Sequence, residues 1–429
     1  MIKIVDANNR AEVEALLNPA VIRDRATEKA ATKIVARVRA DGDAALRHYA
    51  RTLDRWEGPL EVSRRQIEAG ARKAPRDVRA ALEAAARAIR VVAAAQRPRE
   101  WRVTPAPGVS VAQRVVPLDR VGCYVPGGRY PLPSSLLMTA IPARVAGVPE
   151  VIVCSPAIDP VMLAAAVEAG VDRVFRLGGA HAVAAMAYGT ATVPRVSKIV
   201  GPGNRWVAAA KALVAQDCPI DFYAGPTEIL IVAERGRASW IAADLIAQAE
   251  HDVDARAVFL TANRRLATAV AEEVARQLPA DGPAAASLWN HGGVIVTRTM
   301  REAEALANDA ASEHLVVDSE ARARAIRHAG AVFIGSWTAQ VAGDYALGSN
   351  HTLPTAGVAR TRGGLHAADF VKLVSTQRVT AAGLRGVART VTTLARAEGL
   401  EGHARSIDVR VPAAAPSSRR RPARKARVR

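Results

Sequence analysis

Hydrophobic and polar residues follow two kinds of spacing along this chain, and the change between them divides it into segments. Between residues 10 and 98, alanine, leucine, arginine and glutamate recur at helical spacing without a strand-like apolar run, which predicts helices. From Arg114 on, short apolar runs that end in Gly, Ser or Pro alternate with helical stretches. The runs that we expect to form strands are 115–125, 148–154, 171–177, 198–200, 228–233, 257–260, 293–296 and 331–334. From about Asp369 to Arg405 the spacing is helical again.

Strands that alternate with helices are typical of βαβ units and of parallel sheets. Because the runs fall into two sets, we predict an α/β fold with two Rossmann-like, doubly wound parallel-sheet domains and small helical appendages at the N- and C-terminal ends. The length of 429 residues agrees, since one core seldom serves a chain of this size. Loops such as 201–204 and 224–227 are expected at the strand ends where open sheets bind ligands.

Composition narrows the class of protein. Half of the residues are hydrophobic, with a full complement of Gly and Pro, as in a soluble globular protein. No apolar run approaches the roughly 18 residues that span a bilayer, and residues 1–10 lack the apolar stretch of a signal peptide. The cysteines Cys123, Cys154 and Cys218 form no C-x-x-C pair, so we expect neither a disulfide framework nor a thiolate zinc site. We predict a cytoplasmic protein without membrane association.

A net charge of +18 suggests binding to nucleic acid, but the positions of the charged residues weaken this interpretation. Seven of the charges lie in residues 419–429, after a run of Pro, Ala and Ser at 412–418. Such a segment buries too little apolar surface to fold, so we predict a disordered basic tail at 412–429. We expect a solvated extension without a specific partner; the alternative is weak, non-specific contact with nucleic acid.

Two short polar clusters carry the candidate chemistry: 248–251, which reads Gln-Ala-Glu-His, and 312–314, which reads Ser-Glu-His. Gln248 and His251 are three residues apart in a predicted helix, 240–251, and therefore share a helix face on which both can reach one ion. Together with Asp344 and His403 they offer one amide oxygen, two imidazoles and one carboxylate. This sulfur-free set suits Zn²⁺ with open coordination positions, or Mn²⁺ or Co²⁺.

Each of these residues also has an ordinary structural interpretation, and spacing alone leaves both open. A single histidine near an apolar face is commonly a hydrogen-bonded core residue. Asp344, within Gly-Asp-Tyr, can be a turn residue or a helix cap. Glu313 and His314 can be a solvated pair near the end of a helix. No standard catalytic motif decides the question, and the phosphate-loop candidate 201–204 has Trp206 where a third glycine would fall.

Several strings, in order over about residues 20 to 410, resemble the histidinol dehydrogenase family. The matching strings are Tyr124-Val-Pro-Gly-Gly128, Gly201-Pro-Gly-Asn204, Ile220-Asp221 with Ala224-Gly-Pro-Thr-Glu228, Asp244 to Asp252, Asn308 with Ser312-Glu-His-Leu315, Gly343-Asp-Tyr345 with Asn350 to Thr355, and Ala397-Glu-Gly-Leu400 with His403. The resemblance implies oxidation of L-histidinol through L-histidinal to L-histidine with two NAD⁺, the last steps of histidine biosynthesis. It also implies a homodimer whose zinc sites draw residues from both subunits, with a C-terminal arm that crosses the interface.

The resemblance also implies roles for individual residues. Zinc ligands are expected at Gln248, His251, Asp344 and His403, with one Zn²⁺ per subunit. Glu313 and His314 match the catalytic pair, in which the carboxylate activates water and the imidazole accepts protons. Substrate contacts are expected from His351, Glu398 and Thr227, together with the zinc ligands and Glu313. NAD contacts are expected from Tyr124, His181 and Asn204. The metal role that we favour is to orient the substrate by chelation.

Taken together, the pattern and the resemblance predict five segments. These are an N-terminal appendage at 1–19, a discontinuous first α/β domain at 20–123 and 227–365 with the catalytic pair and most metal ligands, a second, NAD-contacting α/β domain at 124–226, a C-terminal helical arm at 366–411, and the tail at 412–429.

Two departures from the family pattern lie in the expected sites. Thr227 stands where the family usually has serine, and His181 replaces a glutamine that usually faces NAD, so we expect altered cofactor affinity rather than its loss. An alternative within this class is a related NAD-dependent zinc dehydrogenase that acts on another polar alcohol, such as a dihydroxy sulfonate. Thr227 and Arg362-Gly-Gly364 leave that alternative open, whereas Glu398, which can pair with a cationic amine, favours histidinol.

Overall fold

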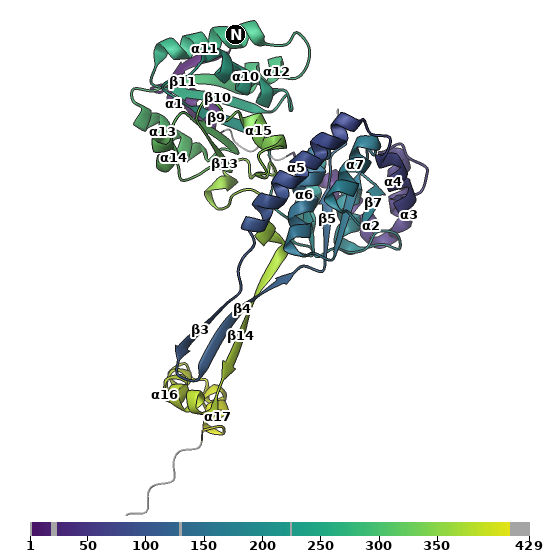
Figure 1. The fold of residues 1–429 in the computed structure, drawn as a ribbon, viewed down its shortest axis with the longest axis vertical. Coiled ribbons are helices and arrows are strands. Elements are labelled where there is room, and N and C mark those ends of the chain that lie inside the picture. The colour runs from purple at the N-terminus through teal and green to yellow at the C-terminus, as the bar shows by residue number, and fades with distance from the viewer. Residues whose placement is uncertain (1, 19–23, 128–130, 224, 412–429) are drawn as a thin grey trace, which may run out of the picture. The chain divides into compact units, whose positions relative to one another are not determined.

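The computed structural model describes residues 2–18, 24–127, 131–223 and 225–411, and the chain forms two compact units (Figure 1). The first unit comprises Met1–Arg97 and Pro117–Val371, and the second comprises Pro98–Val116 and Lys372–Arg429. The prediction of a mixed α/β protein with parallel sheets is confirmed. The predicted disordered tail at 412–429 lies outside the described residues, as do Gly128 and Ala224 of the family-like strings.

The larger sheet of the first unit runs in the order β1-β11-β10-β9-β12-β13, and all of its neighbouring strands are parallel. Its strands are β1 (Lys3–Asp6), β9 (Glu228–Val232), β10 (Arg256–Thr261), β11 (Gly292–Val296), β12 (His314–Val317) and β13 (Ala331–Ile334). Alternate residues enter different buried clusters: Ile229 and Ile231 lie in one, and Leu230 and Val232 lie in the other. Both faces are therefore covered, as the continuous apolar runs of the strands require.

Helices supply the rest of each cluster around this sheet. The helices are α1 (Arg10–Leu17), α10 (Ala238–Ala249), α11 (Arg264–Gln277), α12 (Ala284–His291), α13 (Met300–Ala310), α14 (Glu320–Ala325) and α15 (Gln340–Tyr345). Leu245 of α10 and Val270 of α11 pack in the same cluster as Ile229. Leu16 of α1 and Ala307 of α13 pack in the cluster of Leu230.

The smaller sheet of the first unit runs in the order β2-β7-β6-β5-β8, parallel except for the β2–β7 pair. Its strands are β2 (Glu61–Val62), β5 (Arg120–Tyr124), β6 (Glu150–Ser155), β7 (Arg173–Arg176) and β8 (Lys198–Val200). The helices around it are α2 (Arg25–Asp41), α3 (Asp43–Thr52), α4 (Arg64–Ala71), α5 (Arg76–Ala95), α6 (Pro133–Ala146), α7 (Pro160–Ala169), α8 (Gly179–Tyr188) and α9 (Arg205–Val214). Short 3-10 helices, η1 (Val358–Arg360) and η2 (Ala367–Phe370), follow the larger sheet in the chain.

The structure assigns the N-terminal residues differently from our prediction, which placed 20–123 in the first α/β domain. Helices α2 to α5 pack on the smaller sheet: Leu82 and Ile89 of α5 share a cluster with Leu137 of α6, and β5 is a strand of that sheet. The predicted appendage 1–19 instead supplies β1, which pairs with β11 at the edge of the larger sheet. An amphipathic pattern shows that a helix has an apolar face, but not which sheet that face covers.

The second unit contains a sheet in the order β14-β4-β3, formed by β3 (Trp101–Ala106), β4 (Val109–Pro117) and β14 (Val371–Val379), followed by α16 (Ala381–Ala397) and α17 (Glu401–Asp408). We predicted helix from Asp369, and the first part of that segment is strand. Its side chains are mostly exposed, so its conformation is set by main-chain pairing with β4 rather than by a buried face. Within the described residues, no helix is long and apolar enough to cross a membrane.

Candidate active site

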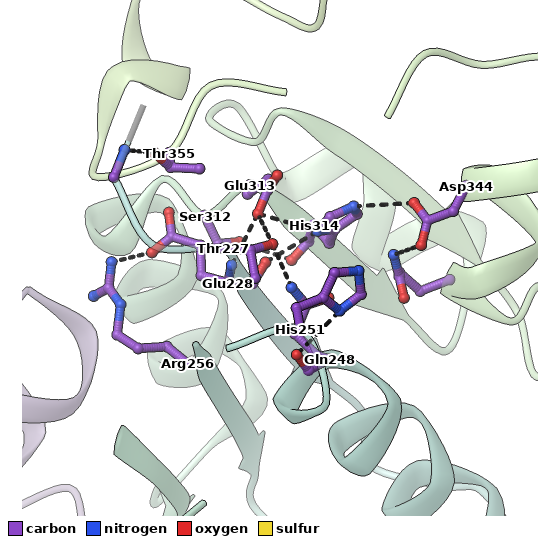
Figure 2. Close-up of polar contacts among 12 residues, drawn as sticks. Thr227, Glu228, Gln248, His251, Arg256, Ser312, Glu313, His314, Asp344 and Thr355 are labelled. Carbon is purple, nitrogen blue, oxygen red and sulfur yellow. Dashed lines mark hydrogen bonds and ion pairs between the residues drawn. The ribbon is translucent and has the colours of Figure 1, made fainter. Parts of the chain in front are cut away.

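The candidate catalytic residues lie at the amino ends of two neighbouring strands of the larger sheet (Figure 2). Glu228 begins β9 and His314 begins β12, and the parallel register pairs His314 with Ile229. Thr227 and Glu313 immediately precede the two strands. We expected the loop that ends at Thr227 at the ligand-binding end of the sheet; it lies at the opposite, amino end, because it enters β9 instead of leaving a strand.

Glu313 is held by two donors. One of its carboxylate oxygens, Oε2, accepts a hydrogen bond from the main-chain N–H of Glu228 at 2.8 Å and another from the Thr227 hydroxyl. Only 6% of Glu313 is exposed. These two bonds fix the carboxylate at the amino ends of β9 and β12. Hydrogen bonds to an ionised group are among the stronger ones in proteins.

His314 lies beside this carboxylate with its two ring nitrogens in different surroundings. Nδ1 is 3.1 Å from the main-chain oxygen of Glu228 and 3.5 Å from Glu313 Oε2. Nε2 is buried without a hydrogen-bond partner among the described residues, and it lies 3.6 Å from Asp344 Oδ1, an ion-pair distance. Burial alone would lower the pKa of His314, but the charges of Glu313 and Asp344 outweigh it and raise the pKa to about 10.

Gln248 and His251 come from the carboxyl end of α10 and the turn after it. The Gln248 amide donates from Nε2 to the Thr227 hydroxyl oxygen, while its Oε1 is buried without a partner among the described residues. The helix ends at Ala249, slightly before the predicted 251, and the exposed His251 follows it with Nδ1 3.3 Å from the main-chain oxygens of Ala247 and Gln248. Both side chains of the predicted helix face therefore lie near Thr227 and Glu313 (Figure 2).

Asp344 approaches the same cluster from α15. Its Oδ2 accepts from Gln340 Nε2 at 2.7 Å, and its main-chain oxygen is 3.0 Å from His351 Nδ1. Burial would raise the pKa of Asp344, but His314, His351 and Gln340 together lower it. The ring of His351 reaches Ser135 of α6 through Nε2 at 3.3 Å, and burial lowers the pKa of His351. His351 is thus held close to the cluster by its contact with Asp344.

A buried ion pair that the sequence did not predict lies beside the candidate catalytic pair. The Glu228 carboxylate contacts the guanidinium of Arg256 on β10, and its other oxygen accepts from the main-chain N–H of Ala356 at 3.1 Å. Arg256 also donates to the main-chain oxygen of Leu17 at 3.1 Å. Burial raises the pKa of Glu228 to about 7 despite the guanidinium. The sequence did contain a signal for this pair, because Glu228 and Arg256 are charged residues that each begin an otherwise apolar strand.

The structure brings together some of the expected metal ligands. Gln248, His251 and Asp344 lie near the candidate catalytic pair in the first unit, whereas Glu398, the C-cap of α16, and His403, on α17, belong to the second unit. Among the described residues, no three His, Cys, Asp or Glu side chains form a group that would hold a metal ion. The donors nevertheless fit a cation, because the Gln248 Oε1 is buried without a hydrogen-bond partner among the described residues, and the Gln248 amide and the Glu313 carboxylate bind the same Thr227 hydroxyl.

The expected cofactor residues lie at the carboxyl ends of strands in the smaller sheet. Tyr124 ends β5, and its hydroxyl accepts from the main-chain N–H of Gly179 at 3.1 Å. Asn204 follows β8 and caps α9, with its side-chain oxygen 3.1 Å from the Trp206 nitrogen. His181 on α8 is fully buried, and its Nε2 is 2.8 Å from Asp54. The carboxyl edge is where open α/β sheets bind ligands.

Comparisons with known proteins give a consistent result. The family model described as histidinol dehydrogenase matches residues 19–411. The histidinol dehydrogenase of Halobacterium salinarum is 48% identical over 390 residues, which cover 88% of this chain and 92% of the relative. That of Aromatoleum aromaticum is 44% identical over 94% of this chain and 95% of its own length. The crystal structure of histidinol dehydrogenase from Elizabethkingia anophelis superposes with a TM-score of 0.91 at 30% identity, covering 96% of this chain and 98% of that one.

Proposed function

Because the chain belongs to the histidinol dehydrogenase family, we propose that Glu313 and His314 are the catalytic pair of its histidinol oxidation and that Gln248, His251 and Asp344 hold a zinc ion beside them. The NAD-dependent oxidation of histidinol itself follows from the family. The comparisons give no support to a dihydroxy sulfonate as substrate. The single observation that carries the residue assignment is the convergence of these side chains around the amino ends of β9 and β12.

His314 is suited to accept the alcohol proton at Nε2. The Nδ1 position is occupied by the contact with the main-chain oxygen of Glu228, which can only accept, so Nδ1 carries the proton and Nε2 is the free position. As the alcohol carbon gives its hydride to NAD⁺, the hydroxyl proton passes to Nε2 and the carbonyl forms. The ring must first lose the proton that Glu313 and Asp344 stabilise, and a cation held by Asp344 would favour that loss by competing with the ring for this carboxylate. One proton and one hydride leave the substrate in this step, which yields the aldehyde.

Glu313 is placed to act on water in the second oxidation. The aldehyde must add water before a second hydride can leave, and the carboxylate beside His314 can accept a proton from that water. The two donors that hold Oε2 in place leave the other oxygen, Oε1, free for this purpose. The second hydride then passes to a second NAD⁺ and the carboxylic acid forms.

The proposed metal site has an amide oxygen, an imidazole and a carboxylate in the first unit, and we propose His403 of a second copy as the further ligand. When bound, Zn²⁺ would supply a positive template on which the imidazole and the amine of the substrate can be oriented. The chain holds the donors ready: Thr227 fixes the amide of Gln248 and Gln340 fixes the carboxylate of Asp344. His351, which contacts Asp344, and Glu398 are proposed to bind the substrate.

We further propose that the protein is a homodimer, with the two sheets of the first unit as Rossmann-like doubly wound domains. The second unit supports dimer formation, because its strands β3 and β14 are mostly exposed and carry large apolar side chains such as Trp101, Val103 and Leu373 at the surface. A second copy would cover such a surface. The cytoplasmic location and any contact of the tail with nucleic acid stay predictions.

A combined experiment tests the proposal. The purified protein should contain about one zinc per chain and should form NADH from L-histidinol at a rate that falls when the metal is removed and returns when Zn²⁺ is added. His251→Ala should lose the metal while the protein stays folded. Full metal content in that variant would contradict the proposed ligand set.

A further inference from the structure

Two glycine turns at the carboxyl edge of the smaller sheet are each held by a buried aspartate that comes from elsewhere in the chain. We propose that these aspartate clamps, Asp221 with Lys211 and Asp54 with His181, are positioning devices that keep the cofactor-binding turns in the conformation that accepts NAD⁺. The inference rests on the proposed function, because it takes those turns to be the cofactor site. It assigns roles to Asp54, Lys211 and Asp221, which none of the motif arguments above gave them.

The first clamp grips Gly201 at both of its main-chain polar groups. The N–H of Gly201 donates to Asp221 Oδ2 at 2.7 Å, and its carbonyl oxygen accepts from Lys211 Nζ at 3.0 Å. Lys211 and Asp221 also form an ion pair, with side chains that are 3% and 0% exposed. Lys211 lies on α9, the helix that Asn204 caps, so the clamp ties the turn to its own helix.

Gly201 needs such support because its conformation is unusual. Its φ is +117°, a region that L side chains rarely adopt, and a Cβ at this position would lie 2.1 Å from the main-chain oxygen of Tyr124. The turn thus passes directly against Tyr124, the other residue expected to contact NAD. A glycine can leave this conformation easily, and the two hydrogen bonds from the buried pair oppose that.

The second clamp has the same design on the turn before α8. Asp54 Oδ2 accepts from the main-chain N–H of Gly178 at 2.9 Å and lies 2.8 Å from His181 Nε2. The side chains of His181 and Asp54 are 1% and 7% exposed. The next residue, Gly179, has φ +54° and donates its N–H to the Tyr124 hydroxyl. Both turns therefore meet at Tyr124.

We expected His181 to contact NAD, but its buried position suits an indirect role in cofactor binding. Its ring is buried against Asp54, and Nδ1 has no hydrogen-bond partner among the described residues. That nitrogen would lie 3.8 Å from a Cβ on Gly179, so the ring packs against the glycine turn. We assign His181 a positioning role through Asp54 and Gly178.

Rigid turns suit a reaction that uses two cofactor molecules for each substrate. The site must release NADH and bind NAD⁺ between the two oxidations, and a turn that stays ordered avoids repeated loss of conformational entropy on binding. If a broken clamp left the turns competent for a tenth of the time, the apparent Kd for NAD⁺ would rise about tenfold. Burying charged groups is costly for stability, so a functional role would account for their presence here.

The test compares disruptive and conservative variants of each clamp in the full-length, zinc-loaded enzyme. Lys211→Met with Asp221→Ala removes both contacts to Gly201, whereas Lys211→Gln with Asp221→Asn can keep them without charge. His181→Leu removes the contact to Asp54, and His181→Gln can keep it. We expect the disruptive variants to raise the KM and Kd for NAD⁺ about tenfold or more while the KM for histidinol stays unchanged. The conservative variants should recover much of the affinity.

A matched control exists in the larger sheet. Asp318 accepts from the main-chain N–H of Glu234 at 2.8 Å and from Arg322 Nε at 2.9 Å, which is a partly buried pair on a turn outside the proposed cofactor site. Arg322→Met should lower Tm as the clamp variants do and leave the KM for NAD⁺ unchanged. If this control raised that KM equally, the effect would be one of general stability and the inference would be overturned.

Hydrogen exchange separates failure of this inference from failure of the proposed function. In the unmodified protein, NAD⁺ should protect the main-chain amides of 176–181 and 198–206. No protection there would show that the cofactor binds elsewhere and that the proposed site is wrong. Protection there, combined with unchanged NAD⁺ affinity in His181→Leu and in the disruptive Lys211 and Asp221 variant, would overturn the clamp alone. Should the double variant fail to fold, His181→Leu and His181→Gln decide the question.

Discussion

The imidazole Nδ1 of His314 points at the main-chain oxygen of Glu228, 3.1 Å away, on the neighbouring strand of the same parallel sheet. A main-chain oxygen keeps its place as long as the sheet is intact, so the tautomer of the ring is set by β9 rather than by a mobile side chain. The ion pair of Glu228 with Arg256 anchors that strand end from the other side. The proposed catalytic base is therefore oriented by the fold itself.

This relationship predicts the effect of His314→Asn. The asparagine amide can still donate to the Glu228 oxygen, but no nitrogen remains to accept a proton at the Nε2 position. We expect kcat for histidinol oxidation to fall about a hundredfold or more, with little change in the KM for NAD⁺. Zinc content and Tm, measured alongside steady-state NADH formation, should stay near those of the unmodified protein. A variant that keeps most of its kcat would show that another group accepts the proton.

Glu313→Gln should separate the two oxidations. An amide oxygen can still accept from Thr227 and Glu228, so the geometry is preserved, but the side chain no longer takes a proton from water. Only the second oxidation consumes water, so oxidation of histidinal should fall more than oxidation of histidinol. The two half-reactions are measured by supplying each substrate separately. Equal losses in both would contradict this division of roles.

Thr227 connects the catalytic carboxylate to the proposed metal site. Its hydroxyl donates to Glu313 and accepts from Gln248 Nε2, which fixes the amide and leaves the buried Gln248 Oε1 without a partner among the described residues. Thr227→Val keeps the shape and removes both bonds, and we expect zinc affinity to fall about 10- to 100-fold, as for other residues that support metal ligands. Thr227→Ser, the usual residue of the family, is the control and should keep both zinc affinity and activity. A normal zinc affinity in the valine variant would show that Thr227 does not support the proposed metal site.

The metal-free protein should lose stability in alkaline solution through His314. The pKa of this histidine is raised to about 10 in the folded protein, above the 6.5 of an unperturbed histidine. The folded state therefore holds the proton more tightly, so its stabilising contribution is complete below pH 6.5 and disappears as the pH rises through 10, with a slope of at most about 1.4 kcal/mol per pH unit. Urea unfolding of chelator-treated protein at several pH values measures this slope.

The control for this pH dependence is His314→Asn, which should lack that part of the slope. Zinc-loaded protein should show less of it as well, because a cation at Asp344 would compete with the positive ring for the same carboxylate. An identical slope in the histidine and asparagine proteins would mean that other groups dominate the alkaline loss.

The apolar runs predicted strands β5 to β11 and β13, because a buried strand is a short-range pattern, but they did not predict β12, which begins at His314. Gln248 lies at the end of α10 and His251 in the turn after it, close to the predicted helix 240–251, whereas Glu313 and His314, for which the end of a helix was one interpretation, lie at the start of a strand. The sequence did not predict that the amino ends of β9 and β12 form the site, since the strand order brings Thr227 beside Glu313 across 86 positions of sequence. Nor did the sequence predict the buried contacts of Arg256 with Glu228 or of Lys211 and Asp221 with Gly201. In the sequence these are ordinary charged residues, and only the fold shows that they are buried.

The proposed metal site draws residues from two copies of the chain, and this sharing can be tested. If His403 of one subunit completes the metal site of the other, then two inactive variants should restore each other. His314→Asn damages the catalytic pair and leaves its own His403 intact, whereas His403→Ala damages the donated ligand and leaves the catalytic pair intact. In a mixed dimer, one site would combine the intact catalytic pair with the intact His403, and the other would carry both defects.

Mixing the two variants after partial unfolding and refolding should therefore recover NADH formation that neither shows alone. The recovered activity should rise with the fraction of mixed dimers, measured with a size tag on one variant. The control mixes His314→Asn with Glu313→Gln: both defects lie in the same proposed half of the site, so no mixed dimer contains an intact one. Recovery is counted in each mixture as the NADH formation above the sum of its two variants measured separately, because Glu313→Gln keeps part of the first oxidation. If the first mixture recovers no more than this control, each subunit completes its own site, and the proposal of shared metal sites fails.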